Sequence, residues 1–145
     1  MTDNPETIRY TADVVCLRGD YVLVIRRGWD PYKDELALPG GHVDEGETSR
    51  VAGARELLEE TGIRVAAEDL ERLDVYDRPD RDPRGRYVSV AYVVRVPEGT
   101  VAQAGDDATA VQWVPLAAPG TLAFDHAEIL DDARRHQLTA SPGRC

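Results

Sequence analysis

Residues 41–63, GHVDEGETSRVAGARELLEETGI, combine a glycine-containing loop with a helical pattern that is crowded with acids. Thr48 is a suitable first residue for a helix, because its side-chain oxygen can accept a backbone N–H of the first turn. Gly62 suits the other end, where many helices close with a left-handed residue. The segment therefore predicts an α-helix that begins after Thr48 and ends at Thr61.

The predicted helix has apolar and acidic sides. At about 100° per residue, the apolar side contains Val51, Ala54, Leu57 and Leu58, and the other side contains Glu56, Glu59 and Glu60. Like charges three or four positions apart destabilise a helix by about 0.2–0.5 kcal/mol per pair. A divalent cation with oxygen ligands would cancel this repulsion, whereas the alternative is an ordinary solvated helix face.

The composition limits the classes of partner. The chain has 145 residues and a formal net charge of −10, which disfavours nucleic acid and anionic membrane surfaces as partners. The apolar runs are too short to span a bilayer. An acidic protein that binds a phosphate-bearing substrate also needs a cation to receive it.

The length suits a single domain over residues 1–145, with flexible tails expected at residues 1–7 and 139–145. Cys16 and Cys145 show no disulfide framework, and the N-terminus lacks the pattern of a signal peptide. We therefore expect a cytoplasmic protein.

The remaining chain predicts a mixed α/β fold. Residues 9–18 and 21–26 form a predicted hairpin around Gly19-Asp20, and residues 86–96 alternate so that one strand face is uniformly apolar. Further strands are expected at residues 36–38, 70–76 and 111–114. A second helix is expected at residues 125–138, with Ile129, Leu130 and Ala133 facing inward.

Residues 41–63 also fit the pattern G-x5-E-x7-R-E-U-x-E-E-x-G-U, in which U is a bulky aliphatic residue, at every position. Seven fixed residues would match by chance on the order of once in a hundred million starting points. The segment resembles the Nudix box, the signature of the Nudix (MutT-like) hydrolases. This resemblance implies an α/β/α sandwich around a mixed sheet, Mg²⁺ or Mn²⁺ as cofactor, and hydrolysis of a nucleoside diphosphate linked to another moiety.

The resemblance implies roles for the acids of the box. Glu59 and Glu60 match metal ligands, and Glu56 matches a further ligand or the base that activates water. The carbonyl of Gly40 is expected as an additional ligand. Metal ions would polarise the phosphate oxygens and lower the pKa of a bound water.

Arg55 is expected to orient these carboxylates through charge-assisted hydrogen bonds, with Glu47 as its partner in the loop. Outside the box, Asp106 and Asp107 are candidates for the base or for another metal ligand. The alternative is that these two acids form an exposed acidic turn.

The segment 77–94, DRPDRDPRGRYVSVAYVV, resembles the ADP-ribose pyrophosphatase branch of the family. Arg81, Arg84 and Arg86 are therefore candidates to contact a phosphate or a ribose. The alternative is a solvated loop in which arginines and aspartates pair with one another.

Aromatic and histidine residues outside the box have two readings. Trp29 and Tyr32 would either stack on a nucleobase or pack against protein. His126 would either approach the substrate or lie partly buried beside a helix cap formed by Asp125.

Three functions follow from these observations. The leading one is metal-dependent hydrolysis of ADP-ribose to AMP and ribose 5-phosphate. The alternatives are a housekeeping pyrophosphohydrolase of nucleoside triphosphates or other nucleotide derivatives, and a non-catalytic ADP-ribose-binding sensor. The complete set of box carboxylates and the short segment after the last helix count against the sensor. The expected partner is a small nucleotide, with no nucleic acid or membrane, and the resemblance allows a homodimer.

Overall fold

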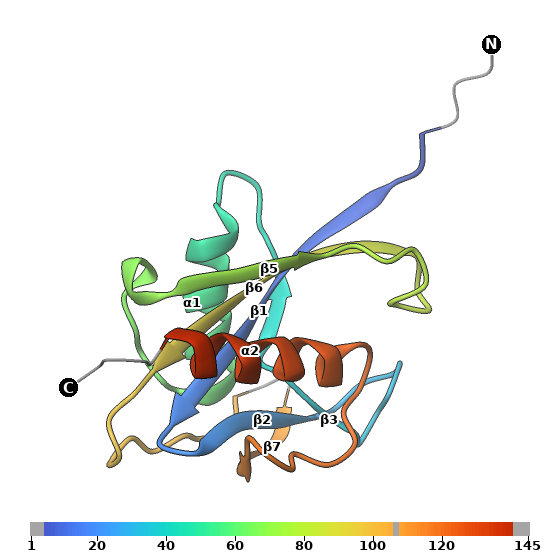
Figure 1. Ribbon diagram of the computed structural model, residues 1–145. Coiled ribbons are helices and arrows are strands. Elements are labelled where there is room, and N and C mark those ends of the chain that lie inside the picture. Colours follow the sequence, from blue (N-terminus) through green and yellow to red (C-terminus); the bar gives the residue numbers. More distant parts are fainter. Residues whose placement is uncertain (1–4, 106–107, 141–145) are drawn as a thin grey trace.

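The computed structural model describes residues 5–105 and 108–140, and its centre is a seven-stranded mixed sheet (Figure 1). The strands follow the order β3-β2-β1-β6-β5, with β4 paired to β1 and β7 paired to β2. Their bounds are β1 (Ile8–Arg18), β2 (Tyr21–Arg27), β3 (Leu36–Ala37), β4 (Gly40–His42), β5 (Glu71–Tyr76), β6 (Arg86–Arg95) and β7 (Ala108–Pro115). The predicted strands are therefore all present, with small shifts of their ends.

Two helices cover the sheet. Helix α1 (Ser49–Thr61) and helix α2 (His126–Ala140) lie on opposite sides of it, and a short helix η1 (Ala67–Asp69) precedes β5 (Figure 1). The predicted α/β/α sandwich around a mixed sheet is confirmed. Within the described part of the chain, neither helix is long and apolar enough to cross a membrane.

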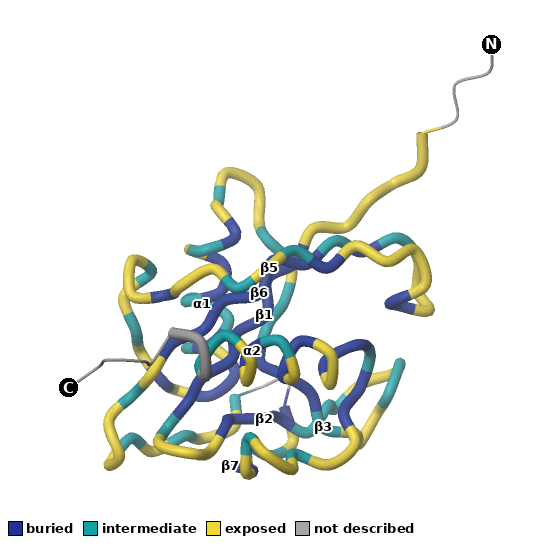
Figure 2. Tube along the Cα trace, in the orientation of Figure 1, coloured by how far each residue is buried: buried dark blue, intermediate teal, exposed yellow. Residues whose placement is uncertain are grey.

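The two central strands are buried on both faces. Strands β1 and β6 run parallel, and Figure 2 shows them as buried chain through the middle of the molecule. On the α1 side Val14 packs with Leu57, and on the α2 side Val15 packs with Ile129. The prediction of a single apolar face for residues 86–96 was thus incomplete, because a helix covers each face of the sheet.

The ends of α1 are as predicted. The Thr48 side chain accepts the Val51 N–H at 3.1 Å, and Gly62 has φ 74° and donates its N–H to the Leu58 carbonyl. The predicted sides of the helix were wrong at two positions, since Val51 is 45% exposed and Glu60 is 8% exposed. Burial of an acid is tolerated here because a backbone N–H satisfies its carboxylate.

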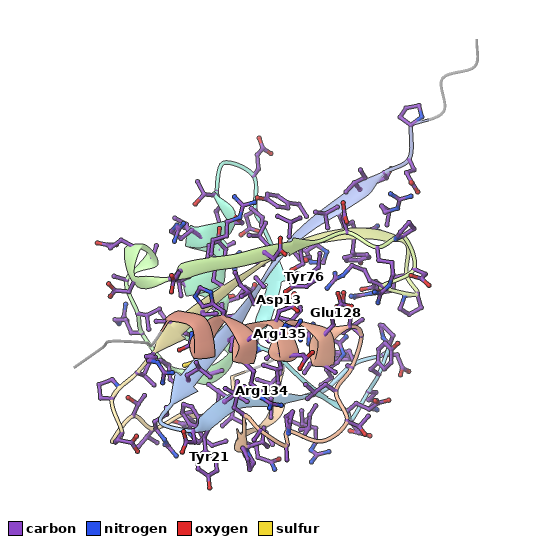
Figure 3. The ribbon with its side chains drawn as sticks, viewed as in Figure 1. Asp13, Tyr21, Tyr76, Glu128, Arg134 and Arg135 are labelled. Carbon is purple, nitrogen blue, oxygen red and sulfur yellow. The ribbon has the colours of Figure 1, made fainter. Side chains whose placement is uncertain are left out.

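One edge of β1 is shared by two strands. Strand β2 pairs with the C-terminal end of β1, whereas β4 pairs with its middle, where Asp13 lies opposite Gly40. This arrangement brings β4 under α1. In Figure 3, Asp13 lies in the interior between the two helices, whereas Tyr21 lies at the exposed edge.

Helix α2 covers the other side of the sheet. Ile129, Leu130 and Ala133 are buried, as predicted from the spacing of apolar residues. The Tyr76 hydroxyl donates to the Asp132 carboxylate at 2.7 Å and ties β5 to the helix. The N-terminal end of α2 lies beside the segment that leads into β4, where the Leu38 N–H donates to His126.

Candidate active site

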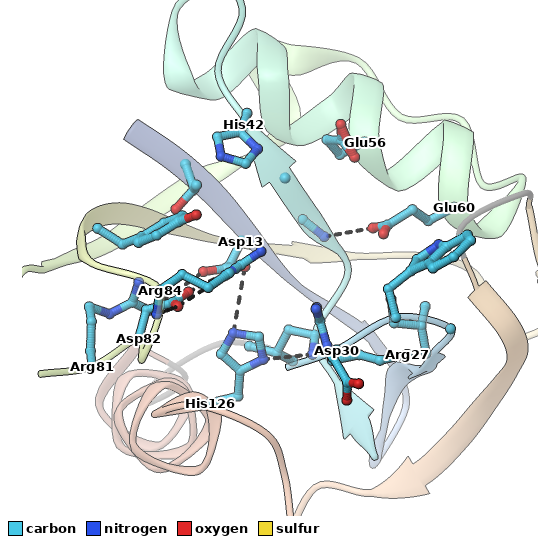
Figure 4. Close-up of a pocket in the computed structure, with 18 of the residues that line it drawn as sticks. Asp13, Arg27, Asp30, His42, Glu56, Glu60, Arg81, Asp82, Arg84 and His126 are labelled. Carbon is cyan, nitrogen blue, oxygen red and sulfur yellow. Dashed lines mark hydrogen bonds and ion pairs between the residues drawn. The ribbon is translucent and has the colours of Figure 1, made fainter. Parts of the chain in front are cut away.

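A pocket of about 380 Å³ lies between α1, β1, β4, the end of β2, the loop before β6 and the start of α2 (Figure 4). Figure 4 shows two acids of α1 on one side and arginines of the loop before β6 on the other. The titratable residues that line it are Asp13, Arg27, Asp30, His42, Asp44, Glu56, Glu60, Arg81, Asp82, Arg84, Tyr87 and His126.

The acidic side of the pocket is formed by Glu56 and Glu60, one helical turn apart. Glu60 Oε1 accepts the Gly40 N–H at 2.7 Å. A Cβ at Gly41 would lie 2.5 Å from the carboxylate carbon of Glu56, so the absence of a side chain lets β4 lie against this acid. Glu59 is not among the lining residues, because it lies about 60° around the helix from Glu56.

Arg55 connects the loop before α1 to the acids of the helix. Its Nε and Nη2 donate to the Glu47 carboxylate at 2.7 and 2.9 Å, and its Nη1 donates to Glu56 at 2.9 Å and to Glu59 at 3.2 Å. The hydrogen bond from Arg55 is the largest cause that lowers the pKa of Glu47 to about 2. The contacts expected of Arg55 and Glu47 are present, and their part in catalysis stays a prediction.

The acidic side of the pocket, formed by Glu56 and Glu60 and called its carboxylate wall below, offers oxygen ligands that fit a hard divalent cation. In residues 5–105 and 108–140, no three His, Cys, Asp or Glu side chains converge into a ready-made metal cage. Mg²⁺ does not require one, since it usually takes one or two carboxylates and completes its shell with water and substrate phosphate. Glu60 and the predicted Gly40 carbonyl would hold the ion, with Glu56 as a further ligand or as the base that activates water. Glu59 would need a change of side-chain conformation to join them.

Two arginines form the basic side of the pocket. Arg84 pairs with Asp82 at 2.8 Å and lies 4.8 Å from the ring centre of Tyr87. Arg27, at the end of β2, donates its Nε to the Pro31 carbonyl. Burial and then the like charge of Arg84 lower the pKa of Arg27. Two guanidinium groups that destabilise each other favour an anion between them.

Arg81 has a different environment from the one predicted for it. It is 7% exposed, and its Nε and Nη2 donate to Asp125 at 2.8 and 2.7 Å. Burial acts to lower the pKa of Arg81, but the bonds to Asp125 and the charge of Asp13 outweigh it and raise the pKa overall. The carboxylate of Asp125, expected to cap α2, is thus occupied by Arg81. This buried pair anchors the loop before β6 to the helix.

Arg86 is not among the residues that line the pocket, and its Nη2 pairs with Glu6 at 2.6 Å. The reason is the alternation of the strand, which directs neighbouring Tyr87 toward the pocket and Arg86 to the other face. Of the three arginines predicted to meet substrate, Arg84 is therefore the best placed.

The floor of the pocket contains an acid and a histidine that are both buried. His126 Nδ1 accepts the Leu38 N–H at 2.9 Å, and its Nε2 lies 3.7 Å from Asp13 Oδ1. Asp13 Oδ2 accepts the Ser89 hydroxyl at 2.6 Å. Burial lowers the pKa of His126 and keeps the ring neutral. Because Nδ1 accepts a hydrogen bond, the proton of the neutral ring is on Nε2.

Sequence reasoning missed Asp13 and Arg27. The signal for Asp13 was an acid inside an otherwise apolar strand, and such a residue needs buried partners. Arg27 follows another arginine, and only the register of β2 decides which of the two faces the pocket. No spacing in the sequence distinguishes them.

The two aromatic candidates have separate environments. Tyr32 packs edge-on against Phe124, with ring centres 4.7 Å apart. Trp29 lines the pocket and is 67% exposed. Trp29 is therefore the aromatic residue available for stacking on a ligand.

The remaining candidates, Asp106 and Asp107, lie outside the described residues. The preceding Gly105 donates its N–H to the Glu60 carbonyl at 2.9 Å, and Gln103 donates to the Thr61 carbonyl. The segment before these aspartates thus covers the C-terminal end of α1.

Residues 7–133 match the model of the NUDIX domain family. The chain belongs to the Nudix family. It is therefore a Nudix hydrolase, and enzymes of this family generally use divalent metal ions. The match spans the whole pocket, from β1 to α2.

Two curated relatives differ in what they do. This Nudix hydrolase is 41% identical over 123 residues to the ADP-ribose pyrophosphatase of Methanocaldococcus jannaschii. The alignment covers 85% of this chain and 71% of the relative. It is 38% identical over 116 residues to the ADPR responsive transcriptional repressor NtrR of Acinetobacter baylyi. This alignment covers 77% of this chain and 46% of the repressor.

A solved structure gives the same fold. The bifunctional NMN adenylyltransferase/ADP ribose pyrophosphatase of Francisella tularensis, complexed with AMP and a manganese ion, superposes with a TM-score of 0.82 and 30% identity. The similarity covers 92% of this Nudix hydrolase and 43% of that enzyme. The chain thus spans less than half of the length of the repressor and of the bifunctional enzyme.

Proposed function

We propose that this Nudix hydrolase cleaves ADP-ribose to AMP and ribose 5-phosphate in a reaction that requires Mg²⁺ or Mn²⁺. The observation that carries the proposal is a pocket in which Glu56 and Glu60 face Arg84 and Arg27 (Figure 4). A diphosphate between these walls meets cations on both sides once a metal ion is bound to the carboxylates. The 41% sequence identity to the ADP-ribose pyrophosphatase of Methanocaldococcus jannaschii supports the same substrate.

In this reaction the oxygen of water forms a bond to one phosphorus, and the bond from that phosphorus to the bridging oxygen breaks. The bridging oxygen leaves on the second phosphate, so each product carries one phosphate monoester. Glu56 is the proposed acceptor of the water proton, since it lines the pocket and Arg55 holds its carboxylate. Arg84 and Arg27 stabilise the negative charge on the phosphates. A bound cation would polarise the P–O bonds.

The buried acid at the floor of the pocket favours ADP-ribose over a nucleoside triphosphate. A triphosphate would extend a third negative group from the diphosphate position, and at the floor that group would meet Asp13. Like charges in a site of low exposure repel strongly. The terminal group of ADP-ribose is an uncharged sugar, which avoids this repulsion.

The test is product analysis for ADP-ribose, NADH, a diadenosine polyphosphate, a sugar nucleotide and the nucleoside triphosphates, with Mg²⁺, with Mn²⁺ and with EDTA. We expect metal-dependent formation of AMP and ribose 5-phosphate as the fastest reaction. Preference for a triphosphate would refute the proposed substrate. Tight binding of ADP-ribose without turnover would favour a sensor.

Glu60→Gln is the matching variant for the carboxylate wall. Its amide oxygen can still accept the Gly40 N–H, so the fold is retained, but the site loses a negative ligand. Loss of several kcal/mol of charge stabilisation corresponds to a fall in kcat of about 100-fold or more. Glu128→Gln on α2 is the control, because Glu128 pairs with Arg78 outside the pocket. Equal turnover by Glu60→Gln and wild type would contradict a metal site at this wall.

A further inference from the structure

We propose that His126 and Asp13 together bind a hydroxyl group of the terminal ribose, which makes them specificity-determining residues. The inference rests on the proposed ADP-ribose function and adds the recognition of one end of that substrate. Both residues line the pocket, and they are 5% and 7% exposed.

The histidine directs a hydrogen-bond donor into the pocket. His126 Nδ1 is occupied by the Leu38 N–H, and the proton of the ring is therefore on Nε2. This N–H makes no hydrogen bond to any residue in the described ranges, because its nearest acidic neighbour, Asp13 Oδ1, is 3.7 Å away. That distance is beyond the normal range for an N–H···O bond. A donor that lines the pocket and has no hydrogen bond to a described residue favours binding of a polar ligand group.

The aspartate supplies the complementary acceptor. Asp13 Oδ2 already accepts the Ser89 hydroxyl and lies 3.9 Å from Arg81, whereas Oδ1 faces His126. Figure 4 shows the two side chains directed toward each other across the floor of the pocket. The pair thus presents one donor and one acceptor that are too far apart to bond directly.

A hydroxyl group matches this pair better than a phosphate does. Its oxygen can accept from His126 Nε2–H while its proton is donated to Asp13 Oδ1. A phosphate oxygen could accept from the histidine, but at neutral pH it would be repelled by the Asp13 carboxylate. The chemistry of the pair therefore selects an uncharged hydroxyl-bearing group.

The position of the pair selects the terminal ribose. Gly40 lies between Asp13 and the metal-binding wall, since its N–H bonds to Glu60 and a Cβ on it would lie 2.4 Å from Asp13 Oδ1. Both riboses of ADP-ribose are attached directly to the diphosphate and can place a hydroxyl at this floor. The adenosine ribose also carries a flat base, which suits the exposed Trp29 at the pocket. The terminal ribose is therefore the sugar that we assign to the floor.

The pair is also held rigidly before substrate binds. His126 is fixed by the Leu38 N–H and by Phe124, whose ring centre is 5.4 Å away, and Asp13 is fixed by Ser89. A rigid site that bonds a substrate hydroxyl discriminates strongly against an analogue without it, because the buried polar groups are then left unpaired. This discrimination is what the experiment measures.

The experiment compares kcat/KM for ADP-ribose with that for three analogues, each of which lacks the 1-, the 2- or the 3-hydroxyl of the terminal ribose. Wild type should prefer ADP-ribose over one of them by about 10- to 100-fold, the range expected for a hydrogen bond to a charged group. If wild type cleaves all three analogues as well as ADP-ribose, the pair binds water and the inference is overturned. This comparison requires no variant.

His126→Asn then tests the donor. Asparagine can still accept the Leu38 N–H but lacks the Nε2–H, so the preference for ADP-ribose should fall to within about threefold. His126→Gln returns an N–H near the Nε2 position and should recover part of the preference. His136→Asn is the control on the same helix, because its Nε2 lies near Glu71 and outside the pocket. An undiminished preference in a folded His126→Asn protein would exclude the histidine.

The outcomes separate the inference from the function on which it rests. Cleavage of ADP-ribose without discrimination between the analogues would refute the hydroxyl site and leave the proposed activity intact. Absence of ADP-ribose cleavage by wild type would refute both. Far-UV circular dichroism and melting of each variant establish that the fold is retained.

Discussion

The buried pair between Arg81 and Asp125 should contribute strongly to stability, and Arg81→Met tests it. The two side chains are 4% and 3% exposed and share two hydrogen bonds of 2.7–2.8 Å. Removal of one partner leaves a buried charge without compensation, which costs about 3–5 kcal/mol. Low exposure means that solvent screening does not reduce this figure. Asp13, 3.9 Å from Arg81, would also lose a neighbouring positive charge.

The assay is urea unfolding followed by far-UV circular dichroism, with the melting temperature as a second measure. For a domain of this size, a loss of 3–5 kcal/mol corresponds to a fall in Tm of about 6–20 °C. Arg78→Met is the control in the same loop, because Arg78 pairs with exposed acids. A loss below about 1 kcal/mol for Arg81→Met would refute the structural role and return Arg81 to the substrate-binding candidates.

Three further predictions concern the pocket. Gly41→Ala should lower kcat with little change in Tm, because the new methyl carbon would lie 2.5 Å from the carboxylate carbon of Glu56 and would displace this carboxylate. Unchanged kinetics would show that the carboxylate is free to move. Arg84→Ala should raise KM for ADP-ribose about tenfold, whereas Arg86→Ala should leave it unchanged; equal effects would argue against the pocket as the binding site. Burial lowers the pKa of His126 below its ordinary value of 6.5, so below that pH the unfolded state binds a proton that the folded state excludes. Stability should therefore fall between about pH 7 and pH 5, more steeply in wild type than in His126→Asn, and parallel urea midpoints would contradict this.

The local features of the fold were predictable because short-range physics determines them. The hairpin of β1 and β2 follows from its turn, and both ends of α1 follow from the capping chemistry of Thr48 and Gly62. The burial of Glu60 was not predictable from the helix alone. It depends on β4, which supplies the Gly40 N–H from twenty positions earlier in the chain.

The same distinction applies to the candidate site. The box spacing predicted Arg55 beside Glu47, because both lie in one continuous segment. The loop before β6 contains arginines without a regular period, so its sequence did not indicate that Arg81 is buried while Arg84 lines the pocket. The difference arises from Asp125, which is 44 residues away and becomes a neighbour only when α2 packs on the sheet.

The arrangement of charges explains how an acidic protein can offer a site for an acidic substrate. Arg55 lies on the outer side of the α1 carboxylates and fixes their geometry. Arg81 is paired with two buried aspartates. Among the charged residues that line the pocket, the carboxylates of α1 require a cation to meet a phosphate, whereas Arg27 and Arg84 do not. In the proposed site, one side of the diphosphate therefore faces a metal ion bound by the α1 carboxylates, and the other side faces arginines that act without the metal. Since catalysis needs charge stabilisation on the reacting phosphorus, metal removal should affect turnover more severely than substrate affinity.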